Sequence, residues 1–410
     1  MPDLKFPKLR FVDVFPVQTE QGRMFGLRDP SGIASNMILL SPDVFYLLQF
    51  FDGKHSRPEL CRKYRQAFGS SLEERQLTTI VSDLDAHLFL DSRNFVRRLE
   101  EMEREFIAAP VRPAVHAGHS YEADPERLRG QLDGFFASEL GPGFPNGRVP
   151  RIVKGLVAPH IDIRAGGPTY AHAYKALAEA EPADCYVILG TGHSGLRNLY
   201  SVLDKDFDTP YGRARCDHAF VQQLRANHQG FECDEILPHK TEHTIEFQVV
   251  FLQHLFQGRR DFTFVPILCS FSYHMLDAAH FQRERAVVDS FCRALKKTVA
   301  ESGKRVCLIA SVDFSHVGPR YGDEESPSPD FLARVREADL ALVRHAEMVN
   351  SDGFYRSVLK KRDRFRVCGF SPIYTLLRSI EAERGELLHY AHTAVDNQNS
   401  TVTFSSIAFY

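Results

Sequence analysis

From about residue 116 onward, short apolar runs alternate with longer helical patterns, and this alternation constrains the fold more than any other feature of the chain. The runs that are apolar almost throughout are residues 151–158, 185–190, 262–268, 305–312 and 401–409. Helical spacing of apolar residues occurs between them, at 168–180, 244–257, 280–300, 330–349 and 371–384. Strands that are apolar on both sides belong in a sheet covered on both faces, so the pattern predicts an α/β domain with a largely buried sheet.

The first hundred residues follow a different pattern. Residues 25–40 are typical of a hairpin that turns at residues 29–32. Two Ser/Pro-opened helices follow, the first from Ser41 and the second from Ser56, and a third helix is expected over 71–87. A short hairpin or wing over 88–96 would complete a small α+β unit of the winged-helix type.

These patterns predict two domains joined by a linker. We expect a winged-helix-like domain over residues 1–97, a charged helix with a Pro-rich stretch over 98–115, and the α/β domain over 116–410. The first domain resembles the PqqD-like domains that recognise peptides in modification pathways. This resemblance implies peptide binding by the N-terminal domain, whose hairpin edge would pair with an extended peptide.

Composition excludes several classes of function. A net charge of -3 does not indicate the basic surface that binds nucleic acid. The basic residues of the second expected helix are expected to form a solvent-exposed helix face. No apolar run approaches the roughly 18 to 20 residues that span a bilayer, and the N-terminus lacks a signal-like apolar core, so we expect a cytoplasmic protein without a membrane partner. The eight cysteines include no CxxC pair, which argues against a disulfide framework or a four-cysteine zinc module.

Histidines follow three of the expected strands directly. His160 comes after run 151–158, His193 follows run 185–190, and Asp313 and His316 follow run 305–312. A single histidine at such a place commonly caps a strand. Ligands of open α/β sheets collect beyond the carboxyl ends of strands, so three histidines there indicate a shared pocket.

The segment HKTEHTIEF, residues 239–247, opens the next helical pattern. His239 and His243 stand one helical turn apart, a spacing at which two imidazoles can share a metal, and Glu242 and Glu246 form a second such pair. The alternative is a charged first turn in which Glu242 complements the helix dipole. His243 and Glu242 are candidate site residues on the first reading.

Cys368 precedes Gly369 at the start of another expected helix. The dipole of a helix N-terminus favours the thiolate, which is the form that ligates metals. With His160 and His193 it would complete a set of two histidines and one cysteine that suits zinc, copper or iron. The alternative is a buried structural cysteine.

Together these segments resemble the Memo family, whose microbial members are called AmmeMemoRadiSam system protein B. The segments that carry the resemblance are APH at 158–160, GxxH at 190–193, EHxIE at 242–246, SxDFSH at 311–316 and CGxxPI at 368–373. It covers about residues 113 to 410, and the N-terminal domain is an addition to the usual family architecture.

The resemblance implies a mixed sheet flanked by helices, similar to the class III extradiol dioxygenases. It implies a bound copper or iron ion, with zinc as the further candidate, held by His160, His193 and Cys368. His243 matches the further pocket histidine, where the dioxygenases keep an acid–base residue, and Asp313 and His316 match the segment that borders the pocket.

Two departures bear on function. The dioxygenases complete their ligand set with a carboxylate, so Cys368 argues against carrying ring cleavage over. The family's common run APHAGY reads APHIDIRAGG here, and Asp162 and Arg164 would therefore alter what is bound.

Two functions follow as hypotheses. The first is a metal-dependent, dioxygenase-like redox enzyme in a radical-SAM-associated pathway, with radical-SAM and AMMECR-type proteins as partners. In it His243 is the general acid/base, oriented by Glu242 or Glu246, and Asp313 and His316 orient the ligands. The second is a non-catalytic peptide- or protein-binding adaptor with a vestigial metal pocket.

Overall fold

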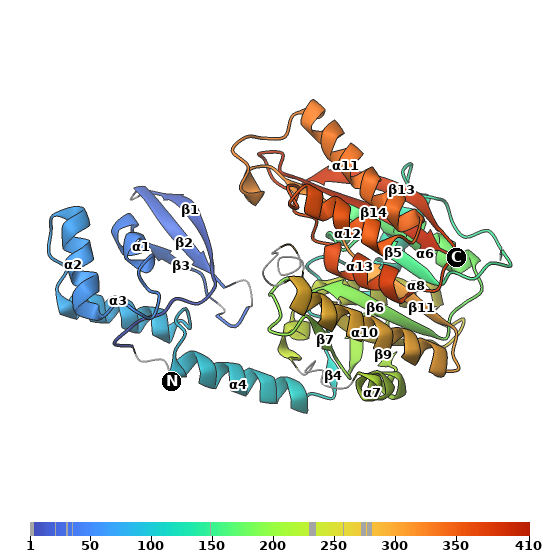
Figure 1. Cartoon of the computed structure of the whole chain (residues 1–410), viewed down its shortest axis with the longest axis horizontal. Helices are drawn as coiled ribbons and strands as arrows, with labels where there is room; N and C mark the ends of the chain where they lie inside the picture. Colours follow the sequence, from blue (N-terminus) through green and yellow to red (C-terminus); the bar gives the residue numbers. More distant parts are fainter. Residues whose placement is uncertain are drawn as a thin grey trace. The chain divides into compact units, whose positions relative to one another are not determined.

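The structure is a computed structural model, and the chain forms two compact units, Met1–Ala109 and Pro110–Tyr410. It describes residues 4–410 except 21, 30, 31, 35, 148, 229–234, 257, 272–275 and 277–280, and it describes no side chains at 281–283. Both units are drawn in Figure 1.

The first unit packs helices against a small antiparallel sheet. Its strands, in the order β1-β2-β3, are β1 (Asp13–Thr19), β2 (Gly22–Arg28) and β3 (Ile38–Leu40). Its helices are α1 (Pro42–Leu48), α2 (Arg57–Phe68), α3 (Glu74–Ala86) and α4 (Arg93–Ala108). Leu27, Leu47, Leu60 and Leu77 are fully buried in a core of its own.

Local sequence signals explain most of these elements. Strands β2 and β3 pair within residues 25–40, as the sequence predicts, although the expected turn at 29–32 includes residues 30 and 31, which lie outside the described part of the chain. Ser56 and Glu59 form a reciprocal capping box at the start of α2, and Gly69 ends that helix with a φ of 71°. Strand β1 was not predicted, because its seven residues lack a regular polar/apolar alternation and include Pro16, a residue seldom found inside a strand.

The wing expected over residues 88–96 does not form. The hydroxyl of Ser92 accepts a hydrogen bond from the backbone N–H of Phe95 and caps helix α4, so residues from 93 onward are helical. Leu90 forms only an isolated bridge with Leu9. The charged helix thus lies inside the first unit and ends just before its boundary at Ala109.

The second unit is built on an eleven-stranded mixed sheet among the described residues, in the order β12-β14-β5-β11-β6-β10-β9-β8-β4, with β13 paired to β14 and β7 to β10. Its strands are β4 (Val111–Arg112), β5 (Gly155–Ala158), β6 (Cys185–Thr191), β7 (Tyr200–Val202), β8 (Asp206–Thr209), β9 (Gly212–Cys216), β10 (Thr263–Cys269), β11 (Val306–Ser311), β12 (His316–Val317), β13 (Gly385–Ala394) and β14 (Thr401–Phe409). The five predicted apolar runs correspond to β5, β6, β10, β11 and β14, and all five strands are almost wholly buried. The predicted α/β fold with helices flanking a mixed sheet is confirmed.

Helices cover both faces of this sheet. They are α5 (Pro125–Ala137), α6 (Ile163–Glu179), α7 (His218–Asn227), α8 (His243–Phe256), α10 (Phe281–Glu301), α11 (Pro329–Glu347), α12 (Ser351–Lys360) and α13 (Phe370–Ser379). Helices α5, α6 and α8 pack together on one face, and α7 and α10 to α13 pack on the other, where α10, α12 and α13 stand in front of the strands in Figure 1. Within the described residues, no helix combines the length and the apolar character needed to cross a membrane.

Helix α6 begins earlier than the predicted range of 168–180. The Asp162 carboxylate accepts a hydrogen bond from the N–H of Arg164, so the helix starts at Ile163 and contains Pro168 in its second turn. Gly167 permits a close approach, since a Cβ atom there would lie 2.3 Å from the ring of Phe135. Gly167 therefore serves the packing of helix α6 against Phe135.

Candidate metal centre

The candidate side chains meet at one edge of the sheet. Strands β5, β11 and β6 are adjacent and parallel, so their carboxyl ends lie side by side. His160 follows β5, Asp313 follows β11 and His193 follows β6. Helix α8 begins against the same edge, because the Ser311 hydroxyl donates a 2.6 Å hydrogen bond to the carbonyl of Thr244.

Three imidazoles converge there. His160, His193 and His243 each offer a ring nitrogen, and these nitrogens all lie within 4.8 Å of one another. The ring of His160 lies 4.8 Å from that of His193 and 5.5 Å from that of His243, centroid to centroid. His160 is buried, whereas the other two rings are partly open to solvent. The structure thus brings together three residues that the sequence placed on three separate segments.

Each of these rings has an oxygen atom beside its Nδ1. The Nδ1 of His160 lies 3.0 Å from the carbonyl oxygen of Ser311, and those of His193 and His243 lie 3.1 Å and 3.2 Å from Oε1 of Glu242. An acceptor at Nδ1 favours the tautomer with the proton on Nδ1, which leaves the lone pair on Nε2. Metal-ligating histidines in proteins are commonly oriented in this way.

Glu242 is the buried carboxylate that orients two of the rings. It accepts hydrogen bonds from the backbone N–H groups of His193, at 2.9 Å, and His243, at 3.0 Å. Burial works against its ionisation, but His193, His243 and these N–H donors outweigh burial and hold its pKa below the usual value. Burial likewise opposes charge on His193, yet the neighbouring Glu242 raises the pKa of that ring. The structure places the Glu242 carboxylate beside the rings of His193 and His243.

Glu246, one turn further along α8, has a different setting. It forms a fully buried ion pair with Arg112, and it accepts hydrogen bonds from the Tyr121 hydroxyl and from the N–H of His116 at 3.0 Å. Arg112 also donates to the carbonyl of Glu242 at 2.8 Å. Glu246 therefore anchors the segment before α5 and supports the start of α8, and its described contacts do not include the His243 ring.

The helical pair of His239 and His243 does not form. His239 lies in a 3-10 turn, Leu237–Lys240, before α8 begins at His243. Its Nε2 lies 3.0 Å from the hydroxyl of Ser201, at another place in the fold. Pro238 starts a turn there, so the α-helical spacing does not apply.

Cys368 lies beside the first histidine. Its Sγ is 3.3 Å from Nε2 of His160 and 3.5 Å from the carbonyl oxygen of Asp313. Gly369 lets the chain pass close to the strand end, since a Cβ there would lie 2.6 Å from that same oxygen. Burial, together with the Asp313 carboxylate, raises the pKa of the Cys368 thiol well above its usual value. The thiolate expected from the helix N-terminus is therefore overridden by burial, and a bound cation would be needed to favour it.

Asp313 and His316 differ in their contacts with the cluster. Asp313 accepts a hydrogen bond from the N–H of His160 at 3.1 Å, and its second oxygen lies 3.6 Å from Nε2 of that ring. Burial raises the pKa of Asp313 to about 6. The Nδ1 of His316 faces the carbonyl oxygens of Phe314 and Arg366, at 3.1 and 3.2 Å, and burial lowers its pKa. Asp313 thus touches a candidate ligand directly, whereas His316 is held by backbone.

Asp162 and Arg164, which differ from the common family sequence, pair with each other. They form an ion pair of 2.7 Å, and Asp162 caps helix α6.

Sequence reasoning missed His116, whose ring lies 5.7 Å from that of His243 and whose Nε2 lies 2.9 Å from the carbonyl of Thr241. The only signal for His116 in the sequence was its place within residues 113 to 410, the range that resembles the family.

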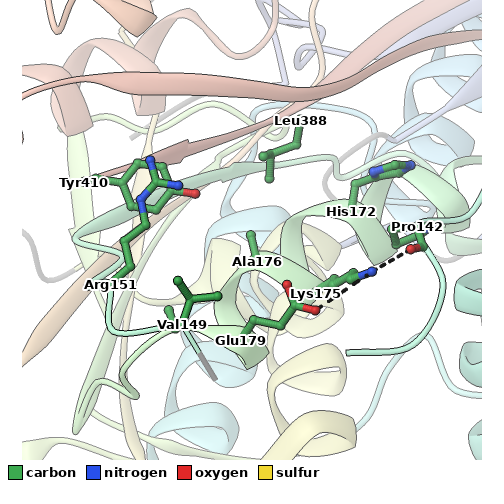
Figure 2. A pocket seen from close by; sticks show the side chains of 10 residues that line it. Pro142, Val149, Arg151, His172, Lys175, Ala176, Glu179, Leu388 and Tyr410 are labelled. Carbon is green, nitrogen blue, oxygen red and sulfur yellow. Dashed lines mark hydrogen bonds and ion pairs between the residues drawn. The ribbon is translucent and has the colours of Figure 1, made fainter. Parts of the chain in front are cut away.

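A cavity of about 240 Å³ lies elsewhere on this unit, where Figure 2 shows Arg151 against the ring of Tyr410 and Lys175 directed toward Pro142 and Glu179. Arg151 precedes β5, whereas His160 follows it, so this cavity lies toward the amino end of the strand. Its lining carries no group of converging metal-ligand atoms. We assign it no part in the candidate centre.

The donors of the candidate centre fit a transition-metal ion. Burial lowers the pKa of both His160 and His243 to about 3, so their rings are neutral and carry free lone pairs. Imidazole nitrogens with an adjacent thiol suit zinc, copper and iron, and the donor types do not select among them.

Comparison with known proteins finds one matching family model and several similar proteins. The family model described as Memo-like protein matches residues 112–408. A MEMO1 family protein of Aquifex aeolicus is 27% identical over 409 residues, which cover 98% of this chain and 100% of that protein. MEMO1 family proteins of Methanopyrus kandleri and Thermococcus kodakarensis are each 32% identical over 72% of this chain and 98% of their own length. More than a quarter of this chain thus has no counterpart in the latter two, whereas the Aquifex aeolicus protein aligns with nearly all of it.

Proposed function

The chain belongs to the family of Memo-like proteins, and on that premise we propose that it binds one transition-metal ion and acts as a metal-dependent redox enzyme. His160, His193 and Cys368 hold the ion, and His243 is the general acid/base. Iron and copper are the proposed metals, with zinc as the third candidate. The convergence of three imidazoles beside a cysteine carries this proposal.

The position of Cys368 supports its place among the ligands. A thiolate about 2.3 Å and an imidazole about 2.0 Å from one tetrahedral ion lie roughly 3.5 Å apart. The 3.3 Å between Sγ and Nε2 of His160 is close to that separation. When bound, the ion would supply redox and Lewis-acid chemistry at the carboxyl edge of the sheet.

The role of His243 rests on its contact with Glu242. A nitrogen of the neutral ring lies within 4.8 Å of ring nitrogens of His160 and His193, and its Nδ1 lies 3.2 Å from the Glu242 carboxylate. Nε2 would accept a proton from a bound substrate, and Glu242 would stabilise the imidazolium that results. Asp313 keeps His160 in place through the backbone N–H of that residue.

The wider role is proposed from the resemblance to the family. We place the protein in a radical-SAM-associated modification pathway, with a radical-SAM protein and an AMMECR-type protein as partners. A dioxygenase-like reaction fits the fold, while the cysteine in the ligand set argues against simple ring cleavage.

The test is anaerobic reconstitution of the full chain with iron, copper and zinc in turn. One equivalent of metal that depends on His160 and, for iron or copper, a thiolate-to-metal charge-transfer band that depends on Cys368 are expected. Cys368→Ser should therefore remove that band, His160→Ala should remove that equivalent, and His243→Gln should retain it. Cys61→Ser, a partly buried cysteine of the first unit, is the matched control and should change nothing.

Two outcomes would overturn parts of this proposal. A band that survives in Cys368→Ser removes the cysteine from the ligand set. Loss of metal in His243→Gln to the same extent as in His160→Ala makes the site a three-histidine centre and leaves the acid/base role without a residue.

Peptide binding by the first unit is the second candidate, in which the protein is an adaptor. Strands β1 and β3 are the edges of its sheet, and Val14, Met37 and Leu39 beside or within them are exposed. An extended peptide would add to such an edge through main-chain hydrogen bonds. In cells that lack the native protein, full complementation by His160→Ala would favour the adaptor, and loss of complementation would favour the enzyme.

A further inference from the structure

We propose a second metal site, distinct from the histidine cluster, in which Asp204, Cys216 and His218 bind a zinc-type divalent cation. Their ligand atoms, a carboxylate oxygen, Sγ and a ring nitrogen, all lie within 4.8 Å of one another. None of these residues contributes to the centre described above.

The β8–β9 hairpin brings the three residues together. Asp204 lies just before β8, Cys216 is the last residue of β9, and His218 is the first residue of α7. Strands β8 and β9 are antiparallel, so the start of one meets the end of the other at the base of the hairpin. Asp217 caps α7 by accepting a hydrogen bond from the N–H of Phe220, which turns His218 back toward the hairpin base.

The contacts within this group form one connected network. Nδ1 of His218 is hydrogen-bonded to Asp204, and its Nε2 lies 3.5 Å from Oδ1 of Asp206. That same Asp206 oxygen accepts a 2.8 Å hydrogen bond from the backbone N–H of Cys216. Arg215 pairs with the other oxygen of Asp206 at 3.3 Å, so both Asp206 oxygens have partners and Asp204 supplies the carboxylate of the group.

The three side chains of the proposed site differ in their exposure to solvent. Cys216 is only 4% exposed, while the side chain of His218 is 56% exposed, so a cation reaches the thiol from the solvent side of the ring. One thiolate, one imidazole and one carboxylate are ligands that zinc takes in tetrahedral sites, with water in the fourth position. On binding, the sulfur–metal bond forms as the Cys216 thiol loses its proton to solvent.

The competing explanation is an ion pair of His218 and Asp204 at a helix start, with Cys216 as a core residue. That explanation treats the sulfur as part of the core, whereas Sγ also lies within 4.8 Å of both the carboxylate oxygen and the ring nitrogen. The Sγ of Cys216 lies 3.9 Å from the carbonyl oxygen of Leu203, which is a weak hydrogen-bond partner.

The test is titration of the full chain with Co²⁺ as an optical probe, followed by Zn²⁺ competition. A thiolate-to-cobalt band that disappears in Cys216→Ser and persists in Cys368→Ser is the expected result. His218→Ala should weaken Co²⁺ binding at this site by at least about 100-fold, since even residues that only orient ligands change affinity by about 10- to 100-fold. His392→Ala, which removes an exposed histidine from β13, is the control and should have no effect.

The exposed position of His218 keeps the test informative if Cys216→Ser folds poorly, because His218→Ala removes no buried group. A cobalt band that is insensitive to both Cys216→Ser and His218→Ala would overturn the proposal. So would the absence of any Zn²⁺-dependent rise in the unfolding temperature of Cys368→Ser, in which only the second site keeps its cysteine.

Discussion

The two ends of strand β5 place polar groups in opposite surroundings. At the carboxyl end, His160 and Asp313 have side chains that are each 3% exposed, and the carboxylate accepts two backbone N–H groups. At the amino end, Arg151 and Glu386 pair at 3.2 Å with side chains 35% and 51% exposed. Burial makes each hydrogen bond at the first end necessary, whereas water can replace those at the second. Function is therefore expected where polar groups are both buried and oriented.

The largest effect is expected for the buried ion pair beside the histidine cluster. Glu246→Ala leaves Arg112 buried without its counter-charge and should lower the free energy of unfolding by about 3–5 kcal/mol. Urea unfolding of the full chain measures this change. Glu386→Ala, from the exposed pair, is the matched control, and equal losses in the two variants would break the comparison.

A pH effect is expected behind the same carboxyl edge. Asp339 accepts hydrogen bonds from Ser315, Thr403 and Tyr390, yet burial raises its pKa from the ordinary 3.8 to about 6. A carboxyl whose pKa is raised by folding stabilises the fold below its unfolded pKa and loses that contribution as pH rises through about 6.

Relative to Asp339→Asn, the wild-type free energy of unfolding should therefore fall by roughly 3 kcal/mol between about pH 4 and pH 7. Unfolding series at several pH values test this. Parallel curves for the two proteins would show that the carboxyl does not titrate in that window.

The next effect concerns metal affinity. Glu242→Gln keeps the size of the side chain but removes the charge that orients His193 and His243, and it should weaken metal binding by about 10- to 100-fold. Competition with a chelator measures the change. If affinity is unaltered, the carboxylate has no share in the site.

The smallest effect is expected at the amino end. Arg151→Ala removes an exposed ion pair and a stacking contact with Tyr410, and it should cost less than about 1 kcal/mol of folding stability. It should leave metal binding unchanged. A loss comparable to that of Glu246→Ala would show that exposure does not distinguish the two ends.

The fold was predictable where apolar runs are continuous. The buried strands β5, β6, β10, β11 and β14 stand out from the sequence because both of their faces are covered. Strands β8 and β9 were not predicted, because their sequences, Asp206–Thr209 and Gly212–Cys216, carry charged residues and lie toward an edge of the sheet. The start of α6 was misplaced because Pro168 usually opens a helix, whereas here Asp162 caps it earlier.

Only those site residues that directly follow a strand could be brought together from the sequence. His160, His193 and Asp313 follow strands directly, so the topology alone brings them to one edge. Burial of Cys368 and the partners of Glu242 and Glu246 depend on how α8, α13 and the segment near Arg112 pack. The contacts of Arg112 with Glu246 and of Cys368 with His160 join residues more than a hundred positions apart, which local spacing cannot specify.

Because Glu242 faces both His193 and His243, those two rings cannot reorient independently. Turning either ring removes a partner from a buried carboxylate that already accepts the N–H groups of both residues. Their motions are therefore correlated, and much of the conformational entropy that ligand groups lose on binding is already lost when the chain folds. The carboxylate thus shifts an entropic cost of ion capture from the binding step to folding.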